Sequence, residues 1–174
     1  MNSQTKFGPG DGARRAQRGF SLLELLIVVA IILIIAAIAI PNLVRARLQA
    51  NEASAASSVR SIGTAEVAYN ATYVAGYGTL LQLGSPAVPC VASAASACLL
   101  DDVVTSGTKS GYTLTALPGG VGNTVFVAAS VPKTVGVSGQ RTFCADETGV
   151  VRFDVTGGGA PATDSACEAF PRLQ

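Results

Sequence analysis

Histidine and tryptophan are absent from this sequence of 174 residues, and charged residues make up only 13% of it. Without histidine, the chain lacks the commonest general base of enzymes and the commonest metal ligand. No two of the four cysteines form a Cys-x-x-Cys pair, and the sequence has no glycine-rich phosphate loop and no Gly-x-Ser-x-Gly motif. We therefore expect no catalytic residues, no cofactor and no metal, and we expect that the protein is not an enzyme.

Charge of one sign is also not in excess. Twelve lysine and arginine residues stand against 11 acidic residues, for a formal net charge of +1. Nucleic-acid-binding domains are usually strongly basic, so this balance predicts no direct nucleic-acid site. The low charged fraction compares with roughly 25% in soluble domains and favours a chain that is partly buried in lipid or in other subunits.

One long apolar run dominates what is present. Every residue of 25–40 is apolar, and with residues 20–23 the run has about the length that spans a bilayer. Glu24 interrupts it, and an unpaired carboxylate facing lipid costs roughly 2–3 kcal/mol. This residue is therefore a candidate functional group. The alternative is that Glu24 lies at the membrane edge and stays hydrated.

The segment before this run is short, basic and rich in glycine, and it contains too little apolar surface for a core. Its basic residues predict that the N-terminus is cytoplasmic. A rival interpretation is an ordinary secretory signal, cut after its apolar stretch at a small-x-small site such as Ala37-Ile38-Ala39. The length of the run and the glutamate inside it favour a membrane anchor over a secretory signal.

The sequence Gly-Phe-Ser-Leu-Leu-Glu at 19–24 has basic residues before it and the apolar run to Pro41 after it. This pattern resembles the N-terminal signal of type IV pilins and type II secretion pseudopilins, and the resemblance is clear from about residue 18 to residue 73. It implies that a membrane peptidase cuts after Gly19 and methylates the new amine of Phe20. It also implies that Glu24 meets the N-terminal amine of an adjacent subunit and sets the register between subunits.

The resemblance further implies an α+β pilin fold, in which one long N-terminal helix with a membrane-spanning first half packs on a C-terminal antiparallel β-sheet. The implied partners are the prepilin peptidase and N-methyltransferase, other copies of the chain in a homopolymer, the assembly platform in the inner membrane, and the lipid bilayer before assembly. We expect these boundaries: a cleaved leader at 1–19, the transmembrane and assembly half of the helix at 20–41, its amphipathic half at 42–73, a connecting segment at 74–111, and the sheet with a C-terminal disulfide loop at 112–174.

A helix over residues 20–73 would be roughly 80 Å long, which is too long for one small domain to bury. Pro41 lies inside it and predicts a kink or a local opening, because proline removes a backbone hydrogen bond. In the second half, apolar and polar positions separate onto two faces. The stripe at steps of three and four is Val59, Ile62, Glu66, Tyr69 and Tyr73. The expected polar face is Arg45, Arg47, Glu52 and Arg60.

The connecting segment is rich in glycine, proline, serine and alanine, which are typical of loops. We expect Leu80, Leu81 and Leu83 to anchor it to the core, and residues 97–104 to add a short helix.

Alternation of apolar and polar residues predicts strands at 112–116 and 125–131. Residues 141–145 and 150–155 read as a hairpin, with Gly149 able to adopt a positive φ in the turn.

Three acidic residues in and after this hairpin, Asp146, Glu147 and Asp154, could suggest calcium. The acidic spacing of an EF-hand is absent, so we favour a solvated turn.

An even number of cysteines beyond a membrane segment favours disulfides formed in an oxidising compartment. Three pairings are possible, and free buried thiols are the alternative. We favour Cys90 with Cys98, which closes a small loop, and Cys144 with Cys167. The second pair resembles the C-terminal disulfide loop of many type IV pilins.

These observations predict a structural subunit of a type IV pilus or a related filament, most like a type IVa pilin. Such a subunit would lie in the inner membrane as a single-pass protein with a cytoplasmic N-terminus, and then in an extracellular or periplasmic filament. Within the same superfamily, the alternative is a minor pilin or a type II secretion pseudopilin. From a different class, the alternative is a membrane-anchored periplasmic binding module.

Overall fold

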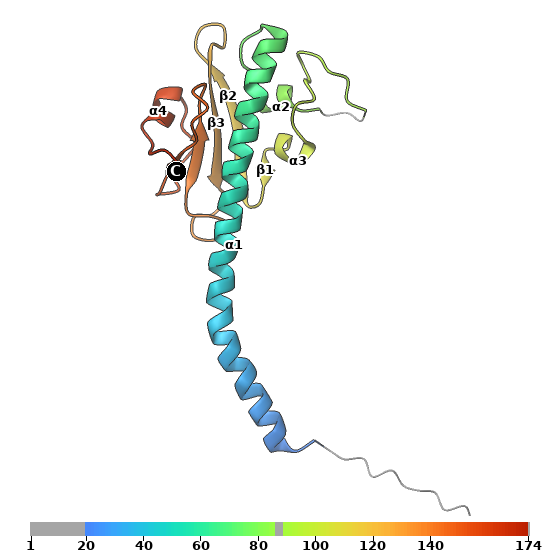
Figure 1. Ribbon diagram of the computed structural model, residues 1–174, viewed down its shortest axis with the longest axis vertical. Coiled ribbons are helices and arrows are strands. Elements are labelled where there is room, and N and C mark those ends of the chain that lie inside the picture. The colour runs from blue at the N-terminus through green and yellow to red at the C-terminus, as the bar shows by residue number, and fades with distance from the viewer. Residues whose placement is uncertain (1–19, 86–88, 174) are drawn as a thin grey trace, which may run out of the picture. The chain divides into compact units, whose positions relative to one another are not determined.

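The computed structural model describes residues 20–85 and 89–173, so Gly19 and the rest of the predicted leader lie outside the described residues. The chain divides into two units, Met1–Pro41 and Asn42–Gln174 (Figure 1). The elements in chain order are α1 (Leu22–Tyr73), α2 (Leu80–Leu83), α3 (Asp102–Thr105), β1 (Thr108–Lys109), β2 (Tyr112–Gly119), β3 (Val125–Pro132), β4 (Thr142–Ala145), β5 (Arg152–Asp154) and α4 (Asp164–Glu168). A long N-terminal helix followed by an antiparallel sheet is the α+β pilin arrangement that the sequence predicts.

Helix α1 begins and ends close to the predicted limits of 20 and 73. It is α-helical through Pro41, so the expected local opening does not appear as a break in the helix. The helix ends where the backbone of Val74 takes a φ of 51° and its N–H still donates to the carbonyl of Asn70. A left-handed residue just after the last turn is a common way to stop a helix, although it is rare for a β-branched residue.

The sheet has five strands in sequence order, β1-β2-β3-β4-β5, and every neighbouring pair is antiparallel. The longest pairing joins β2 to β3, with Leu114 opposite Ser130. Tyr112, Leu114 and Ala116 are buried and alternate with more exposed residues, which confirms the predicted half-buried strand. In Figure 1 the second half of α1 crosses the face of this sheet, with α2 and α3 to one side and α4 to the other.

Strand β3 is buried on both faces, which explains why its residues are almost all apolar. Phe126 and Ala128 belong to the main core, which lies between α1 and the sheet. Val127 and Ala129 belong instead to a second cluster on the opposite face. The other members of that cluster are Cys144, Cys167 and the partly buried Phe170.

The helix stripe predicted from the sequence is the part of α1 that enters the main core. Val59, Ile62 and Glu66 are fully buried, and Tyr69 is 2% exposed. Tyr73 is only partly buried, because it lies in the last turn of the helix. The stripe is therefore confirmed, including its one acidic member.

The connecting segment differs from the expectation in two places. Leu80 and Leu83 are buried, but Leu81 is 69% exposed, so the prediction that all three leucines anchor the segment was wrong for Leu81. Because α2 is a single helical turn, only residues three apart share its buried face. The short helix expected at 97–104 is confined to α3, because residues 97–101 are not helical. The Asp101 carboxylate caps the N-terminus of α3 by accepting from the Val104 N–H at 2.7 Å.

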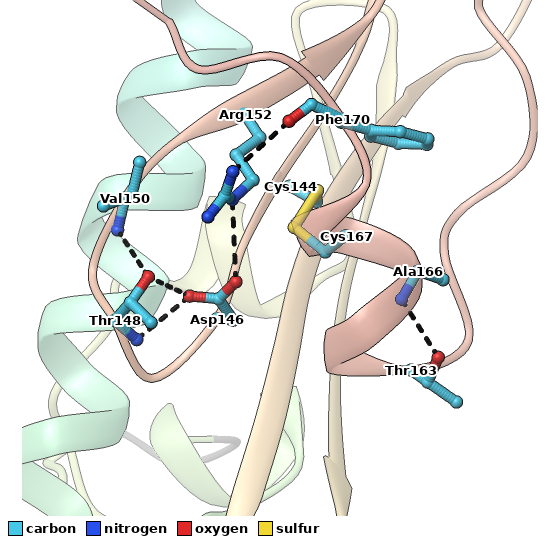
Figure 2. The surroundings of a disulfide bond; sticks show 9 residues. All are labelled: Cys144, Asp146, Thr148, Val150, Arg152, Thr163, Ala166, Cys167 and Phe170. Atoms are coloured by element: carbon cyan, nitrogen blue, oxygen red, sulfur yellow. Dashed lines mark hydrogen bonds and ion pairs between the residues drawn. A yellow bond between two sulfur atoms is a disulfide. The ribbon is translucent and has the colours of Figure 1, made fainter.

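The sheet begins with β1, a two-residue strand that precedes the expected start at residue 112. Near the C-terminus, α4 is an element that the sequence analysis does not predict. Its N-cap is Thr163, whose hydroxyl accepts from the Ala166 N–H at 3.2 Å (Figure 2). Five residues are too few for a periodic pattern, so this cap was the only local signal.

Candidate functional site: the exposed apolar segment and its glutamate

The segment from Leu22 to Pro41 is an apolar helix with almost no burial of its own. Its side chains are exposed, including Leu22 at 81% and Ile38 at 66%. Fully burying one such side chain is worth about 1.5–3 kcal/mol, so leaving all of them in water would be very costly. By length and composition the helix is able to cross a membrane. The segment therefore requires lipid or other protein around it.

Glu24 closes a capping box at the start of this helix. Its Oε2 accepts from the Ser21 N–H at 3.0 Å, and the Ser21 hydroxyl accepts from the Leu23 N–H at 3.3 Å. The two residues thus satisfy two backbone donors that no helical carbonyl can reach. A negative charge in the first helical turn also interacts favourably with the helix dipole.

The sequence pattern predicts an assembly role for Glu24 and none for Ser21. The pattern Ser-x-x-Glu before an apolar run is the sequence signature of a capping box, so this contact could have been recognised. Phe20, the predicted new N-terminus, is 80% exposed and lies immediately before the capped turn. Glu24 therefore accepts a hydrogen bond from Ser21, the residue next to Phe20.

Beyond Pro41, α1 is attached to the sheet through Glu52. The prediction that Glu52 lies on the polar face of α1 was wrong, because the residue is only 7% exposed. Its Oε2 lies 2.7 Å from Nη2 and 2.9 Å from Nε of Arg141. Its Oε1 accepts from the backbone N–H groups of Gln140 at 2.8 Å and Arg141 at 3.2 Å. The carboxylate is buried because four donors replace its water.

The other predicted members of that polar face, Arg45, Arg47 and Arg60, are exposed as expected. The guanidinium of Arg141 lies 5.4 Å from the ring centre of Phe143 and 5.3 Å from that of Phe153. Cation–π contact on both rings holds the guanidinium in place for Glu52. Together, the ion pair and the ring contacts of Arg141 attach the middle of α1 to β4 and β5.

The structure contains the disulfides Cys90–Cys98 and Cys144–Cys167, the pairs that the sequence analysis favours. Cys144 lies in β4 and Cys167 in α4, and both are fully buried (Figure 2). This bond attaches the C-terminal tail to the sheet. Cys90 is exposed, and its bond to Cys98 closes a short loop within the connecting segment.

The β4–β5 turn is exposed at Glu147, Thr148 and Gly149, as the favoured solvated turn requires, but its first acidic residue is buried. Asp146 is only 1% exposed, and its carboxylate lies 3.9 Å from Nε of Arg152 (Figure 2). Its Oδ1 accepts from the N–H of Thr148 at 2.9 Å and also from the hydroxyl of that residue. Asp146 thus stabilises the tight turn itself, in which Gly149 has the expected positive φ of 72°. Within the described residues, no group of three histidine, cysteine or acidic side chains could hold a metal ion.

Comparison with known proteins agrees with this arrangement. The model of the prokaryotic N-terminal methylation motif matches residues 14–40. The chain is 33% identical over 124 residues to the type IV wide pilus major component PilA4 of Thermus thermophilus, an alignment that covers 70% of this chain and 87% of that protein. It is 44% identical over 52 residues to the type IV major pilin protein PilA of Myxococcus xanthus, covering 30% of this chain and 24% of that protein. No solved structure matches the chain.

The structure and the similarity to known proteins point to the same segment of the chain. The exposed apolar helix with an acidic residue in its first turn lies where the methylation motif matches, and the similarity to PilA4 extends through most of the chain. The relatives are structural pilus components and not enzymes. The chain therefore belongs to the type IV pilin family.

Proposed function

We propose that this chain is a major structural subunit of a type IV pilus, made as a membrane-anchored precursor and assembled with other copies of itself. The observation that carries the proposal is the exposed apolar half of α1, which needs lipid before assembly and neighbouring subunits afterwards. The similarity to two relatives named as a major component and a major pilin supports a major role over a minor one.

In this proposal, a prepilin peptidase cuts after Gly19 and methylates the amine of Phe20. The precursor lies in the inner membrane with its N-terminus in the cytoplasm, and an assembly platform extracts it from there. The basic residues before the apolar run support this orientation.

Glu24 then pairs with the N-terminal amine of an adjacent subunit. Two opposite charges buried together offset much of the cost that either would carry alone. A single pair in an apolar interface also specifies the axial register, as one polar residue does in a coiled coil. Pro41 is proposed to be the place where the helix bends during packing.

The test is mass spectrometry of the sheared cell-surface fraction, reading the N-terminal peptide of this protein. A dominant surface protein that begins with N-methylated Phe20 is the expected result. A Phe20 start found only in membranes would show instead a minor pilin or pseudopilin. A Met1 start, or cleavage near Ala39, would refute the filament subunit altogether.

A further inference from the structure

Glu66 occupies an unusual place for a carboxylate, on the inward face of α1 and with no exposed surface. Its Oε2 accepts from the backbone N–H of Gly78, in the connecting segment, at 2.8 Å. Its Oε1 is also buried and has no hydrogen-bond partner in the part of the chain that the structure describes. Native proteins rarely leave a buried polar atom without a partner, so this side chain requires an explanation.

The backbone around Gly78 is held by several contacts at once. A Cβ on Gly78 would come within 3.1 Å of the Tyr69 ring, so a larger residue would require the ring to shift by a few tenths of an ångström. The Tyr69 hydroxyl donates to the carbonyl of Ala94 at 2.6 Å, and the Tyr77 N–H donates to the carbonyl of Asn123 at 2.8 Å. Glu66 therefore lies beneath the part of the connecting segment that contacts both α1 and the β2–β3 turn.

Among residues 20–85 and 89–173, no cation faces Glu66. Strands β2 and β3 and helix α2 contain no charged residue. The titratable side chains nearest on the packed elements are phenols, which carry no positive charge: Tyr69 and Tyr73 on α1, and Tyr77 in the connecting segment. In the described part of the chain the ion pairs lie elsewhere, at Glu52–Arg141 and Asp146–Arg152. Burial accordingly raises the pKa of Glu66 to about 7, against a smaller opposing effect of the Gly78 hydrogen bond.

We propose that Glu66 is a proton-controlled latch that holds the connecting segment closed against α1 when it is protonated and loosens it when it ionises. The neutral carboxyl is tolerated in the core and keeps its hydrogen bond from Gly78. The ionised carboxylate is a buried charge with a single backbone donor and no cation, which is unfavourable. The relief is to admit water at Gly78, because this residue of the connecting segment donates the hydrogen bond to Glu66 and covers it there.

The test is amide hydrogen exchange of the full-length protein in detergent micelles, measured by mass spectrometry of the peptide that contains Gly78. The exchange is measured at about pH 5.5 and at about pH 8.5, and each rate is corrected for the intrinsic exchange rate at that pH. The latch predicts that protection of this peptide falls about tenfold at the higher pH in the wild type. In Glu66→Gln, which has the same shape but cannot ionise, protection should not depend on pH. Glu147→Gln, at an exposed glutamate in the β4–β5 turn, is the matched control and should behave as the wild type.

Equal protection at both pH values in the wild type would overturn the latch, as would the same pH dependence in Glu66→Gln. If that variant does not fold, the near-ultraviolet circular dichroism of the wild type decides instead. The chain has no tryptophan and four tyrosines, three of which, Tyr69, Tyr73 and Tyr77, are the phenols named above around Glu66. A change in the tyrosine signal with a midpoint near pH 7 is expected, and a flat signal across this range would refute the latch.

Discussion

Three glutamates on α1 are held in three different ways, although their side chains are chemically identical. Glu24 is exposed and accepts from the Ser21 N–H in the first turn of the helix. Glu52 is buried against Arg141 and accepts four donors. Glu66 is buried with one backbone donor and no cation. The number and charge of the available donors therefore decide what each carboxylate does.

Helix capping by Glu24 and the charge pairing proposed for it are separable by mutation. Glutamine at this position preserves the capping box, because Gln also accepts from the N-cap backbone, but it removes the negative charge. We expect Glu24→Gln to be processed normally and to reduce surface pili by about tenfold or more, which corresponds to the loss of about 1.4 kcal/mol per subunit contact. Ser21→Ala, which keeps the charge and removes half of the cap, should assemble. The measurement is the pilin content of the sheared surface fraction relative to the membrane fraction.

Normal pili from Glu24→Gln together with a defect in Ser21→Ala would reverse this interpretation. It would mean that capping of the helix matters for assembly and that the charge does not.

Removing the Glu52 side chain should destabilise the unit formed by residues 42–174. Glu52→Ala leaves Arg141 and two backbone N–H groups without their acceptor, and we expect the free energy of unfolding to fall by about 2–3 kcal/mol. This figure is below that of a fully buried pair, since the Arg141 side chain is 37% exposed. Urea denaturation of the full-length protein in micelles, followed by the tyrosine signal, measures it.

Glu147→Ala is the control, because this exposed side chain should contribute less than about 0.5 kcal/mol. An equal, small effect of both substitutions would show that Glu52 is not an anchor of α1.

At the scale of elements, the sequence predicted α1 and the strands well because their signals are local and repeated. The steps of three and four from Val59 to Tyr69 continue over several helical turns, and the alternation in β2 continues over its buried residues. Short elements such as α2 and α4 have no such repetition, and their buried faces depend on what lies opposite them. This is why the exposure of Leu81 was missed.

The two disulfides differ in solvent exposure, and we expect the more exposed bond to be reduced first. Cys90 is exposed, whereas Cys144 and Cys167 have no exposed surface. A thiolate must reach a sulfur atom to attack it, so mild reductant should open Cys90–Cys98 first. Differential alkylation followed by peptide mass spectrometry measures the order.

The loss of stability on reduction depends on the length of the loop that each disulfide closes. The bonds close loops with sequence separations of 8 and 23 residues, so losing Cys144–Cys167 should cost about 1 kcal/mol more from chain entropy alone. Simultaneous reduction of both bonds, or reduction of Cys144–Cys167 first, would show that the C-terminal tail opens readily.

At the scale of the whole molecule, the stability of the folded chain should fall as the pH rises from about 4.5 to about 7. The pKa of Glu66 is raised from 4.5 to about 7 by burial, so between these values the unfolded chain has lost a proton that the native chain retains. This shift corresponds to about 3 kcal/mol, fully present below the lower value and lost above the higher one. Urea denaturation of the wild type and of Glu66→Gln across this range is the measurement, and only the wild type should show the slope.

One other shifted acid acts in the opposite direction. Hydrogen bonds from the side chain and backbone of Thr156 lower the pKa of Asp154, so its contribution is lost only as the pH falls below its usual 3.8. It leaves the range above pH 4.5 unaffected. Identical slopes in the wild type and Glu66→Gln would therefore assign the pH dependence to a group other than Glu66.

The amino-acid sequence by itself determined the membrane-length apolar segment, the signal around Gly19 and Glu24, the helical stripe and the even set of cysteines. Each of these is a property of composition or of short spacing along the chain. Only the tertiary structure decided that Glu52 and Asp146 are buried and that Val127 faces away from α1. Burial of a charge depends on a partner that the fold brings from far away, and Glu52 finds Arg141 at a separation of 89 residues. No local pattern records such a contact, because the helix and the sheet create it only when they pack together.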